Sequence, residues 1–211
     1  KCRQGIAVVG GTGSGKTTLL NALSCEISKS ERIVTIEDSA ELKFDSHPNV
    51  VRLEARPASI EGTGEITIRS LVRNALRMRP DRIVVGEVRG EECIDMLQAM
   101  NTGHDGSMST GHGNSVKGMI RRLEAMYLMS AKLPMDTIRA QIIEGVDIFV
   151  HLIRLNDGRR TVSQVVELVG YEDGNYVLNE IFILNNNKTL VETGNKIINK
   201  GKFELKGITY A

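Results

Sequence analysis

The sequence has little cysteine, and its three cysteines lie far apart along the 211 residues. Cys2, Cys25 and Cys93 are odd in number and form no C-x-x-C pair. This spacing argues against a disulfide framework and against a zinc ribbon, and it is typical of proteins from a reducing compartment. We therefore expect a cytoplasmic protein.

Long apolar runs and an excess of one charge are also missing. No apolar run approaches the ~20 residues that a membrane-spanning helix needs. The opening KCRQGIAVVGG has too short an apolar run, broken by glycine, to be a signal peptide. Lysine and arginine number 27 against 26 acidic residues, so no overall field favours nucleic acid or anionic lipid. The sequence thus predicts no direct membrane insertion and makes nucleic acid a poor candidate partner.

The remaining composition is that of an ordinary globular protein, with 41% hydrophobic and 25% charged residues. A chain of this length forms one large or two small domains and can bury a sizeable core. The first residue is Lys1 rather than methionine, and a strand candidate follows within a few residues. We expect a fragment that begins close to a domain boundary.

Short apolar runs alternate with helical periodicity from the start of the chain to about residue 147. Strands are predicted at 6–9, 32–36, 50–53, 82–85 and 107–110, and helices at 18–27, 66–78, 91–100, 115–129 and 134–143. Strands that alternate with helices predict an α/β fold with a doubly wound, mainly parallel sheet. We place this core at residues 1–155.

The pattern changes after Asp147. The segments DIFVHLIRL, TVSQVVELVGY and YVLNEIFIL are strand-like, and NDGR and EDGN between them are hairpin signals. They predict an antiparallel β ribbon, with residues 156–211 as a β-rich extension of the same domain. The tail from Asn185 onwards is polar and lysine-rich, which indicates one weak hairpin and a solvated surface.

The strongest motif is GGTGSGKT, residues 10–17, which matches G-x-x-x-x-G-K-[ST] between a predicted strand and a predicted helix. Glycines let backbone N–H groups converge on phosphate oxygens, and the helix that follows adds the positive end of its dipole. Lys16 is predicted to reach the β- and γ-phosphates of ATP, and the Thr17 hydroxyl to bind Mg²⁺. The predicted nucleotide-binding residues are Gly11, Thr12, Gly13, Ser14, Gly15, Lys16, Thr17 and Thr18.

Glu87 follows Gly86 where the apolar strand at 82–85 leaves the sheet. A carboxylate in that place costs desolvation free energy unless a nearby cation offsets it. In α/β folds of this kind, ligands lie outside the carboxyl ends of the strands. The usual acid at this strand end is an aspartate, but here Gly86 holds that position. The longer glutamate suits activation of an attacking water. The alternative is a surface ion pair with Arg89.

Two further groups of residues are expected at the same edge. Glu37 and Asp38 end the second predicted strand, and a cation would relieve the repulsion between them. The alternative is that Asp38 caps a helix beside a solvated Glu37. His104 and His112 bracket a short predicted strand, where an imidazole can donate a hydrogen bond to a γ-phosphate oxygen. A zinc site is the alternative here, although no nearby cysteine completes a ligand set.

Four ordered segments carry a resemblance to a known family. GGTGSGKTTLLNAL, TIEDSAEL, RPDRIVVGEVRG and GHDGSMSTGHGNS resemble the Walker A, Asp box, Walker B and His box of the type II/type IV secretion ATPase superfamily. The segment LVRNALRMRPDRIVVGEVRG, followed by DMLQAMNTGHDGSMST, is most similar in sequence to the branch that powers Tad (Flp) pilus assembly. The resemblance runs from about Gly5 to Ile183.

The resemblance implies a RecA-like carboxyl-terminal motor domain of a hexameric ring, normally preceded by an amino-terminal domain that is absent here. It implies Glu87 as catalytic acid/base, Glu37 near the Mg²⁺ and its water, and His112 as phosphate sensor. The family carries phosphate-compensating arginines between the Asp box and Walker B, and by position these are Arg52 and Arg56.

Two further features near these motifs are a row of arginines on one predicted helix and a pair of glycines beside His112. Arg69, Arg73 and Arg77 share one helical face and could equally serve a subunit contact. Gly111 and Gly113 stand where the family usually has larger residues, and two glycines are expected to loosen the backbone around His112.

The sequence therefore predicts a cytoplasmic Mg²⁺-dependent ATPase that powers pilus assembly or protein secretion as a hexameric motor. The resemblance places it at the membrane only peripherally, through an inner-membrane platform protein. A conjugative DNA-transfer ATPase is the alternative within the superfamily. A nucleotide-dependent scaffold that barely hydrolyses ATP is the alternative from another class.

Overall fold

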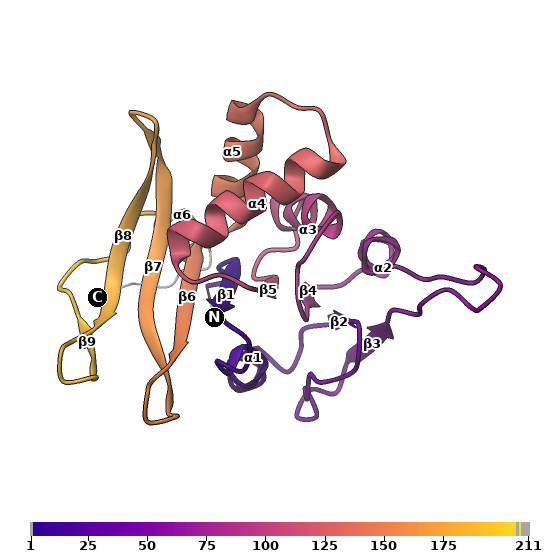
Figure 1. Cartoon of the computed structure of the whole chain (residues 1–211), viewed down its shortest axis with the longest axis horizontal. Coiled ribbons are helices and arrows are strands. Elements are labelled where there is room, and N and C mark those ends of the chain that lie inside the picture. The colour runs from indigo at the N-terminus through magenta and orange to yellow at the C-terminus, as the bar shows by residue number, and fades with distance from the viewer. Residues whose placement is uncertain (1, 206, 208–211) are drawn as a thin grey trace.

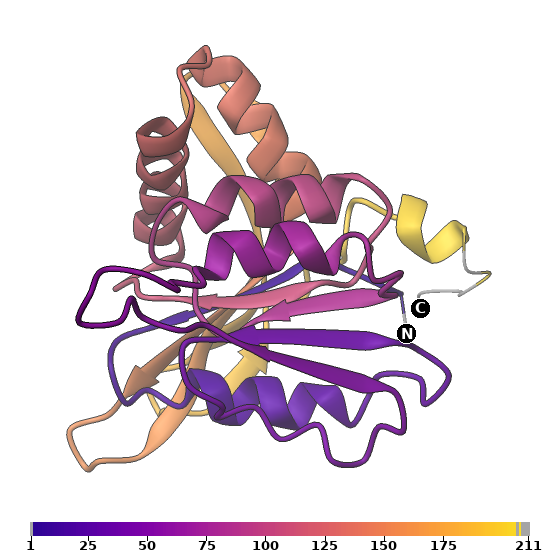
Figure 2. The ribbon, with the colours of Figure 1, turned by 90° about the vertical axis from the view of Figure 1, so that its right-hand side faces the viewer.

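The computed structural model describes residues 2–205 and 207, and these form one nine-stranded sheet with helices on both faces (Figures 1 and 2). The strands are β1 (Ile6–Gly10), β2 (Ile33–Glu37), β3 (Val50–Glu54), β4 (Arg82–Val85), β5 (Met108–Gly111), β6 (Ile148–Arg154), β7 (Arg160–Glu172), β8 (Asn175–Leu184) and β9 (Leu190–Glu192). The helices are α1 (Lys16–Ser24), α2 (Ile68–Ala75), α3 (Glu92–Asn101), α4 (Val116–Ser130), α5 (Met135–Gly145) and α6 (Gly201–Glu204). In the part of the chain described, no helix combines the length and apolarity needed to cross a membrane.

The strand order is β3-β2-β4-β5-β1-β6-β7-β8-β9. Neighbours from β3 to β6 pair in parallel, and β6, β7, β8 and β9 pair antiparallel. The predicted α/β fold with a mainly parallel sheet is therefore confirmed, and so is an antiparallel ribbon at its C-terminal side.

The first strand of that ribbon also belongs to the parallel part of the sheet. The segment at 147–155 was assigned to the antiparallel ribbon, and β6 does pair antiparallel with β7. On its other side β6 pairs in parallel with β1, through Ile6↔Ile148 to Gly10↔Leu152, which was not predicted. Residues 148–152 are all buried, so the run is a central strand covered on both faces. The ribbon therefore continues the same sheet.

Alternation along the strands divides the core between the two faces of the sheet. In β1, Ala7 and Val9 belong to the larger cluster, which includes buried residues of α2, α3, α4 and α5. Val8 belongs to the other cluster, with Leu20 of α1 and Phe44. Figure 2 shows α2 and α3 on one side of the sheet and α1 on the other. Because β1 is covered on both sides, its carboxyl end is rigidly placed.

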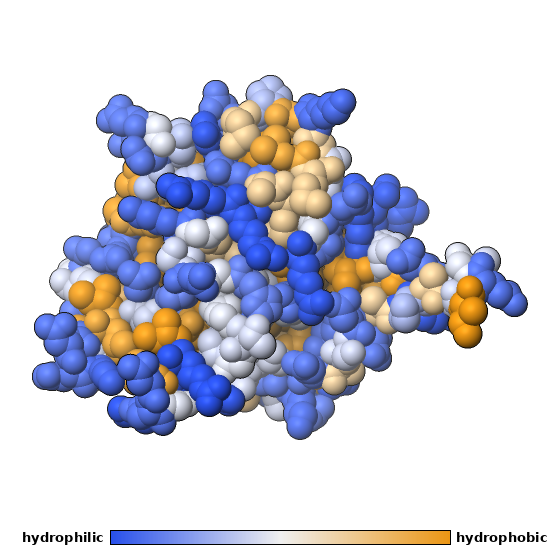
Figure 3. Space-filling view, viewed as in Figure 1, coloured by the Kyte–Doolittle hydropathy of each residue, from blue (hydrophilic) through white to orange (hydrophobic). Residues whose placement is uncertain are grey.

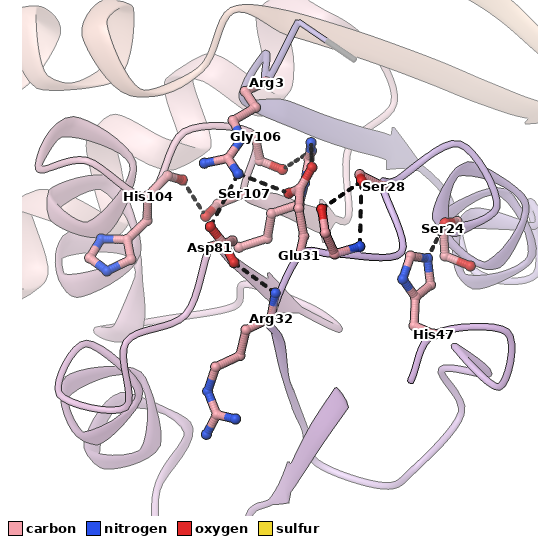
Figure 4. A network of polar contacts seen from close by, with 12 residues as sticks. Arg3, Ser24, Ser28, Glu31, Arg32, His47, Asp81, His104, Gly106 and Ser107 are labelled. Carbon is pink, nitrogen blue, oxygen red and sulfur yellow. Dashed lines mark hydrogen bonds and ion pairs between the residues drawn. The ribbon is translucent and has the colours of Figure 1, made fainter. Parts of the chain in front are cut away.

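A polar network holds together the opposite, amino-terminal edge of the strands (Figure 4). The buried Arg82 donates to Glu31 over 2.6 Å and to the Gly106 carbonyl over 2.8 Å. Arg3 donates to Asp81 over 3.1 Å. Hydrogen bonds from the backbone N–H of Arg32 and from Arg3 hold the pKa of Asp81 below its usual value. This edge is occupied by structural ion pairs.

The lysine-rich tail is fastened to the sheet more firmly than the sequence indicated. Its strand β9 pairs with β8, so the single hairpin expected in the tail forms with the preceding strand. The carboxylate of Glu167, 2% exposed, accepts the backbone N–H groups of Ile198 and Asn199. Lys202 donates to Asp147 over 2.6 Å. Residues 206 and 208–211 of this tail lie outside the described residues.

Candidate active site

The phosphate loop joins β1 to α1 at the carboxyl end of the parallel sheet. Gly13 and Gly15 have φ of 69° and 97°, in the left-handed region where a Cβ is unfavourable. Gly15 gives α1 no side-chain cap. The first N–H groups of a helix have no partner within the helix, so this uncapped end suits an anion.

Two buried polar side chains of the loop are suited to phosphate. Ser14 is 2% exposed, and its Oγ has no hydrogen-bond partner among the described residues. The Lys16 ammonium donates to the carbonyls of Gly10 and Gly11 over 3.2 and 3.1 Å. An ammonium has three N–H donors, so one remains for a phosphate oxygen. Burial lowers the pKa of Lys16, and the charge of Glu87 opposes that shift.

Thr17, the predicted Mg²⁺ ligand, donates its hydroxyl proton to Glu41 Oε2 over 3.2 Å. The hydroxyl oxygen still has lone pairs for a metal when its proton points at a carboxylate. Glu41 is thus a site residue that sequence reasoning missed. The only signal for it was a further acid four residues after Glu37 in TIEDSAEL.

Glu37 ends β2 and shapes the loop that carries Glu41. Its Oε1 accepts the backbone N–H groups of Glu41 and Leu42 over 3.0 and 2.9 Å. The residue is only 6% exposed, and this burial raises the pKa of Glu37 while the two N–H groups act against the rise. One oxygen of the predicted metal-site carboxylate therefore holds the loop in place.

Gly86 explains why the acid of the Walker B segment stands one residue later than usual. A Cβ at Gly86 would lie 2.9 Å from Cγ of Glu37. Any side chain at this position would push against the Glu37 stem. The carboxylate is therefore supplied by Glu87 instead.

Glu87 faces two partners at once. Its Oε1 lies 2.9 Å from His112 Nε2, and its Oε2 accepts a hydrogen bond from Arg89 over 3.0 Å. The side chain is 17% exposed, and Oε1 accepts no well-directed hydrogen bond from the described residues. The ion pair with Arg89, which we considered as an alternative, does exist. It does not make Glu87 a surface residue.

Asp38 pairs with the same arginine, over 3.2 Å to Arg89. The alternative in which Asp38 caps a helix is wrong, because residues 38–49 contain no helix. This carboxylate points across to the loop that follows β4.

The histidines separate to opposite ends of β5. His112 follows the carboxyl end, beside Glu87. His104 lies near the polar network at the amino-terminal edge (Figure 4), with Nδ1 3.3 Å from the Ala99 carbonyl. Among the described residues, no three His, Cys, Asp or Glu side chains gather as a metal site. The zinc alternative thus finds no ligand set there.

The glycines beside His112 lie where an added side chain would meet neighbouring atoms, while the expected loosening of the backbone stays a prediction. A Cβ on Gly111 would lie 2.3 Å from Cε of Met119, and one on Gly113 would lie 2.9 Å from Cγ1 of Val9. Neither glycine has a left-handed backbone. The contact at Gly111 is with the flexible end of Met119, which can move aside, whereas a Cβ at Gly113 would press on the branched Val9 side chain of β1.

The phosphate loop and the carboxyl ends of β2, β4 and β5 line a cavity of about 310 Å³, called the phosphate cavity below. It is lined by Thr12, Gly13, Lys16, Thr17, Glu37, Asp38, Ser39, Glu41, Gly86, Glu87, Arg89, Thr110 and His112. A cavity of about 570 Å³ adjoins it and shares Asp38, Glu87 and Arg89. A third, of about 260 Å³, lies at the start of α1, where β7 contributes Arg160, a second residue that sequence reasoning missed. No sequence motif marked Arg160.

The predicted arginines lie outside the phosphate cavity. Arg52 pairs with Asp45 over 2.9 Å. Arg56 lines the adjoining cavity and donates to the Gly64 carbonyl over 2.8 Å. It starts the loop between β3 and α2, which projects from the body (Figure 1) and carries apolar surface at its tip (Figure 3). Neither arginine lines the phosphate cavity.

Three of these oxygen-bearing side chains fit a magnesium ion. Mg²⁺ prefers oxygen ligands and is usually held by one or two protein groups together with water and substrate phosphates. The Thr17 hydroxyl, the Glu41 carboxylate and the Glu37 carboxylate all line the phosphate cavity. This small donor set suits a metal that arrives with the nucleotide.

The fold and the site together define a P-loop nucleotide-binding protein, with a phosphate loop, carboxylates and a histidine at the carboxyl edge of the sheet. The chain belongs to the family of Type II/IV secretion system proteins, which matches residues 1–157. The resemblance to this superfamily is confirmed.

Known relatives agree with this assignment. The chain is 48% identical over 166 residues to a putative conjugal transfer protein of Mycobacterium tuberculosis, a match that covers 79% of this chain and 47% of that protein. The VirB11 ATPase of the Brucella suis type IV secretion system, solved in complex with sulphate, is 38% identical with a TM-score of 0.70. That match covers 78% of this chain and 48% of VirB11.

The pilus retraction motor PilT, solved with bound ADP, is 28% identical with a TM-score of 0.63, over 81% of this chain and 48% of that one. The fold is therefore the ATPase fold that VirB11 and PilT share. The chain spans about half the length of these relatives, since the matches cover 47% and 48% of theirs.

Replacing His112 with alanine is expected to lower the rate of ATP hydrolysis by about 10²-fold while ATP binding changes little. The imidazole lies beside Glu87, and one donor aimed at the transferred phosphate has about this effect on rate. Single-turnover hydrolysis and calorimetry with ATP and ADP measure the two effects. The matched control is His104→Ala, at the other end of β5. Equal losses of ATP and ADP affinity would make His112 structural.

Proposed function

We propose that this chain is the nucleotide-hydrolysing domain of a Mg²⁺-dependent ATPase that powers type IV secretion or conjugal transfer. The observation that carries the proposal is the meeting of Lys16, Thr17, Glu87 and His112 around one cavity at the carboxyl edge of the sheet. The assignment to type IV secretion or conjugal transfer is supported by two relatives: a putative conjugal transfer protein at 48% identity and a type IV secretion ATPase at 38% identity.

Each residue has a role that its surroundings allow. Lys16 and the uncapped start of α1 bind the phosphates. Glu87 orients a water molecule and accepts its proton at Oε1. Thr17 and Glu41 hold Mg²⁺, which neutralises phosphate charge when bound. His112 responds to the γ-phosphate.

The chain supplies few cations to the phosphates, which favours a ring. Arg52 and Arg56 lie outside the phosphate cavity, and Arg89 is paired with two carboxylates. Arg160 lines only the neighbouring cavity at the start of α1. An arginine from outside the P-loop core can be worth ~10³–10⁵ in rate. We propose that a second copy in a hexameric ring supplies it. The ring would work in the cytoplasm, docked on a platform protein of the inner membrane.

The Tad pilus branch is the second candidate, and the amino-acid sequence around Walker B, LVRNALRMRPDRIVVGEVRG, favours it. The relatives favour conjugal transfer and type IV secretion instead. A rate that rises when DNA is added would support a DNA-transfer machine. ATP binding with negligible turnover at every protein concentration would support a nucleotide-dependent scaffold.

The decisive measurement is the specific ATPase activity of this chain against its concentration, with its mass followed by light scattering. We expect Mg·ATP to bind, hydrolysis to be slow in dilute solution, and the rate to climb faster than linearly with protein concentration as copies associate. A monomer with full activity, independent of concentration, would mean that the site is complete in one chain. The ring proposal would then lose its basis.

A further inference from the structure

Arg89 connects the two acidic segments of the site. One guanidinium nitrogen donates to Glu87 Oε2 over 3.0 Å, and the other lies 3.2 Å from Asp38 Oδ2. The hydrogen bond to Glu87 is the main reason that the pKa of Arg89 lies above its usual value. The side chain thus spans from the loop after β4 to the end of β2.

The backbone that carries Arg89 is fixed independently of its side chain. The N–H groups of Arg89 and Gly90 both donate to Glu92 Oε1 in the first turn of α3, over 2.6 and 2.9 Å. Val88 is buried, and its N–H donates to the Thr110 carbonyl over 2.9 Å. Shortening the Arg89 side chain should therefore leave the loop in place and release only the two carboxylates that it holds, those of Glu87 and Asp38.

Resting on the hydrolytic role proposed for Glu87, we propose that Arg89 is a positioning residue that holds the Glu87 carboxylate over the phosphate cavity, with Asp38 as its anchor. The guanidinium occupies Oε2 of Glu87 and leaves Oε1 beside His112, without a well-directed hydrogen bond of its own. One oxygen is held so that the other can receive a proton.

Arginine is suited to this task in a way that lysine is not. A guanidinium presents donors in a rigid planar fork and can address two carboxylates with different nitrogens, whereas an ammonium is a point charge on a flexible stem. The Asp38 carboxylate pairs with the guanidinium nitrogen that does not contact Glu87, and this second contact limits rotation of the Arg89 guanidinium. Misplacement of a catalytic group by about 1 Å can cost ~10²-fold in rate.

The test is single-turnover hydrolysis with this chain in excess over ATP, together with ATP affinity by calorimetry. Arg89→Ala should lower the rate constant on the order of 10- to 100-fold and leave affinity within about twofold. Arg89→Lys should recover part of the loss, and Asp38→Asn should show a smaller loss of the same kind. The matched control is Arg159→Ala, which removes an exposed arginine paired with Asp157, also two residues away.

A double-mutant cycle separates positioning from a general structural effect. In a Glu87→Gln background, Arg89→Ala should change the residual rate by less than about twofold, because the group it positions is already lost. The same fold-loss in both backgrounds would overturn the inference. A loss of ATP affinity as large as the loss of rate would also overturn it, since the guanidinium would then contact the nucleotide. Glu87→Gln at the parent rate would instead remove the hydrolytic role of Glu87 from the proposed function, and this inference rests on that role.

Discussion

Lys16→Ala is expected to abolish ATP binding at concentrations where the parent chain is saturated. Lys16 is only 8% exposed, and its ammonium donates to the carbonyls of Gly10 and Gly11, so its charge acts on the phosphates at short range from a largely buried position. Removing one partner of such a buried charge pair costs about 2–5 kcal/mol, or roughly 30- to 4,000-fold in affinity. Calorimetric titration with Mg·ATP measures this loss, and hydrolysis should fall with it.

The loss must not come from unfolding, and the pKa of Lys16 bears on this. Burial lowers that pKa in the folded chain, so the charged ammonium opposes folding at pH values below it, and the penalty fades as pH rises through it. Lys16→Ala should therefore melt close to the parent at neutral pH. The matched control is Lys132→Ala, an exposed lysine outside the phosphate cavity. Unchanged ATP affinity in a folded Lys16→Ala chain would remove the phosphate-loop assignment.

Most of the sheet could be predicted because its strands are short, apolar and bounded by clear breaks. The strand predicted at 82–85 is β4 itself, and the one predicted at 50–53 is β3 with one residue more. The parallel pairing of β6 with β1 was not predicted, and this has a physical reason. An apolar run buried on both faces has the same sequence pattern whether its neighbours are parallel or antiparallel.

Within the site, motif residues were predictable and their supporting contacts were not. Motif spacing identified Lys16 and Thr17, the position after a buried strand identified Glu87, and the structure places all three at one cavity. Glu41 reaches Thr17 only because the Glu37 carboxylate turns the chain back after β2. Such a contact depends on the path of a loop, which local pattern does not specify.

The glycines illustrate the same limit. Sequence reasoning interpreted Gly113 through conformational freedom, and the structure adds a steric reason, because a Cβ there would lie 2.9 Å from Cγ1 of Val9. Gly86 likewise makes room for the Glu37 stem. Steric reasons of this kind involve residues far apart in sequence, and they become visible only when the elements are packed.

Glu87→Gln is expected to separate nucleotide binding from chemistry more sharply than any other change in this site. Glutamine keeps the size of the side chain, and its amide oxygen can still accept the hydrogen bond that Arg89 donates to Oε2. An amide has no useful basicity, so the proton of the attacking water loses its acceptor. Hydrolysis should fall by ~10²-fold or more, while Mg·ATP affinity stays near that of the parent.

Single-turnover hydrolysis and calorimetry on the same preparation measure the two quantities, and the matched control is Glu180→Gln on β8, which removes an exposed carboxylate bound to Gln164. A Glu87→Gln chain that hydrolyses ATP near the parent rate would show that another carboxylate accepts the proton. Glu37 and Glu41 line the same cavity and are the two groups to test next. Because Glu37 Oε1 is committed to the backbone of its loop, a loss of rate confined to Glu41→Gln would then transfer the catalytic role to Glu41.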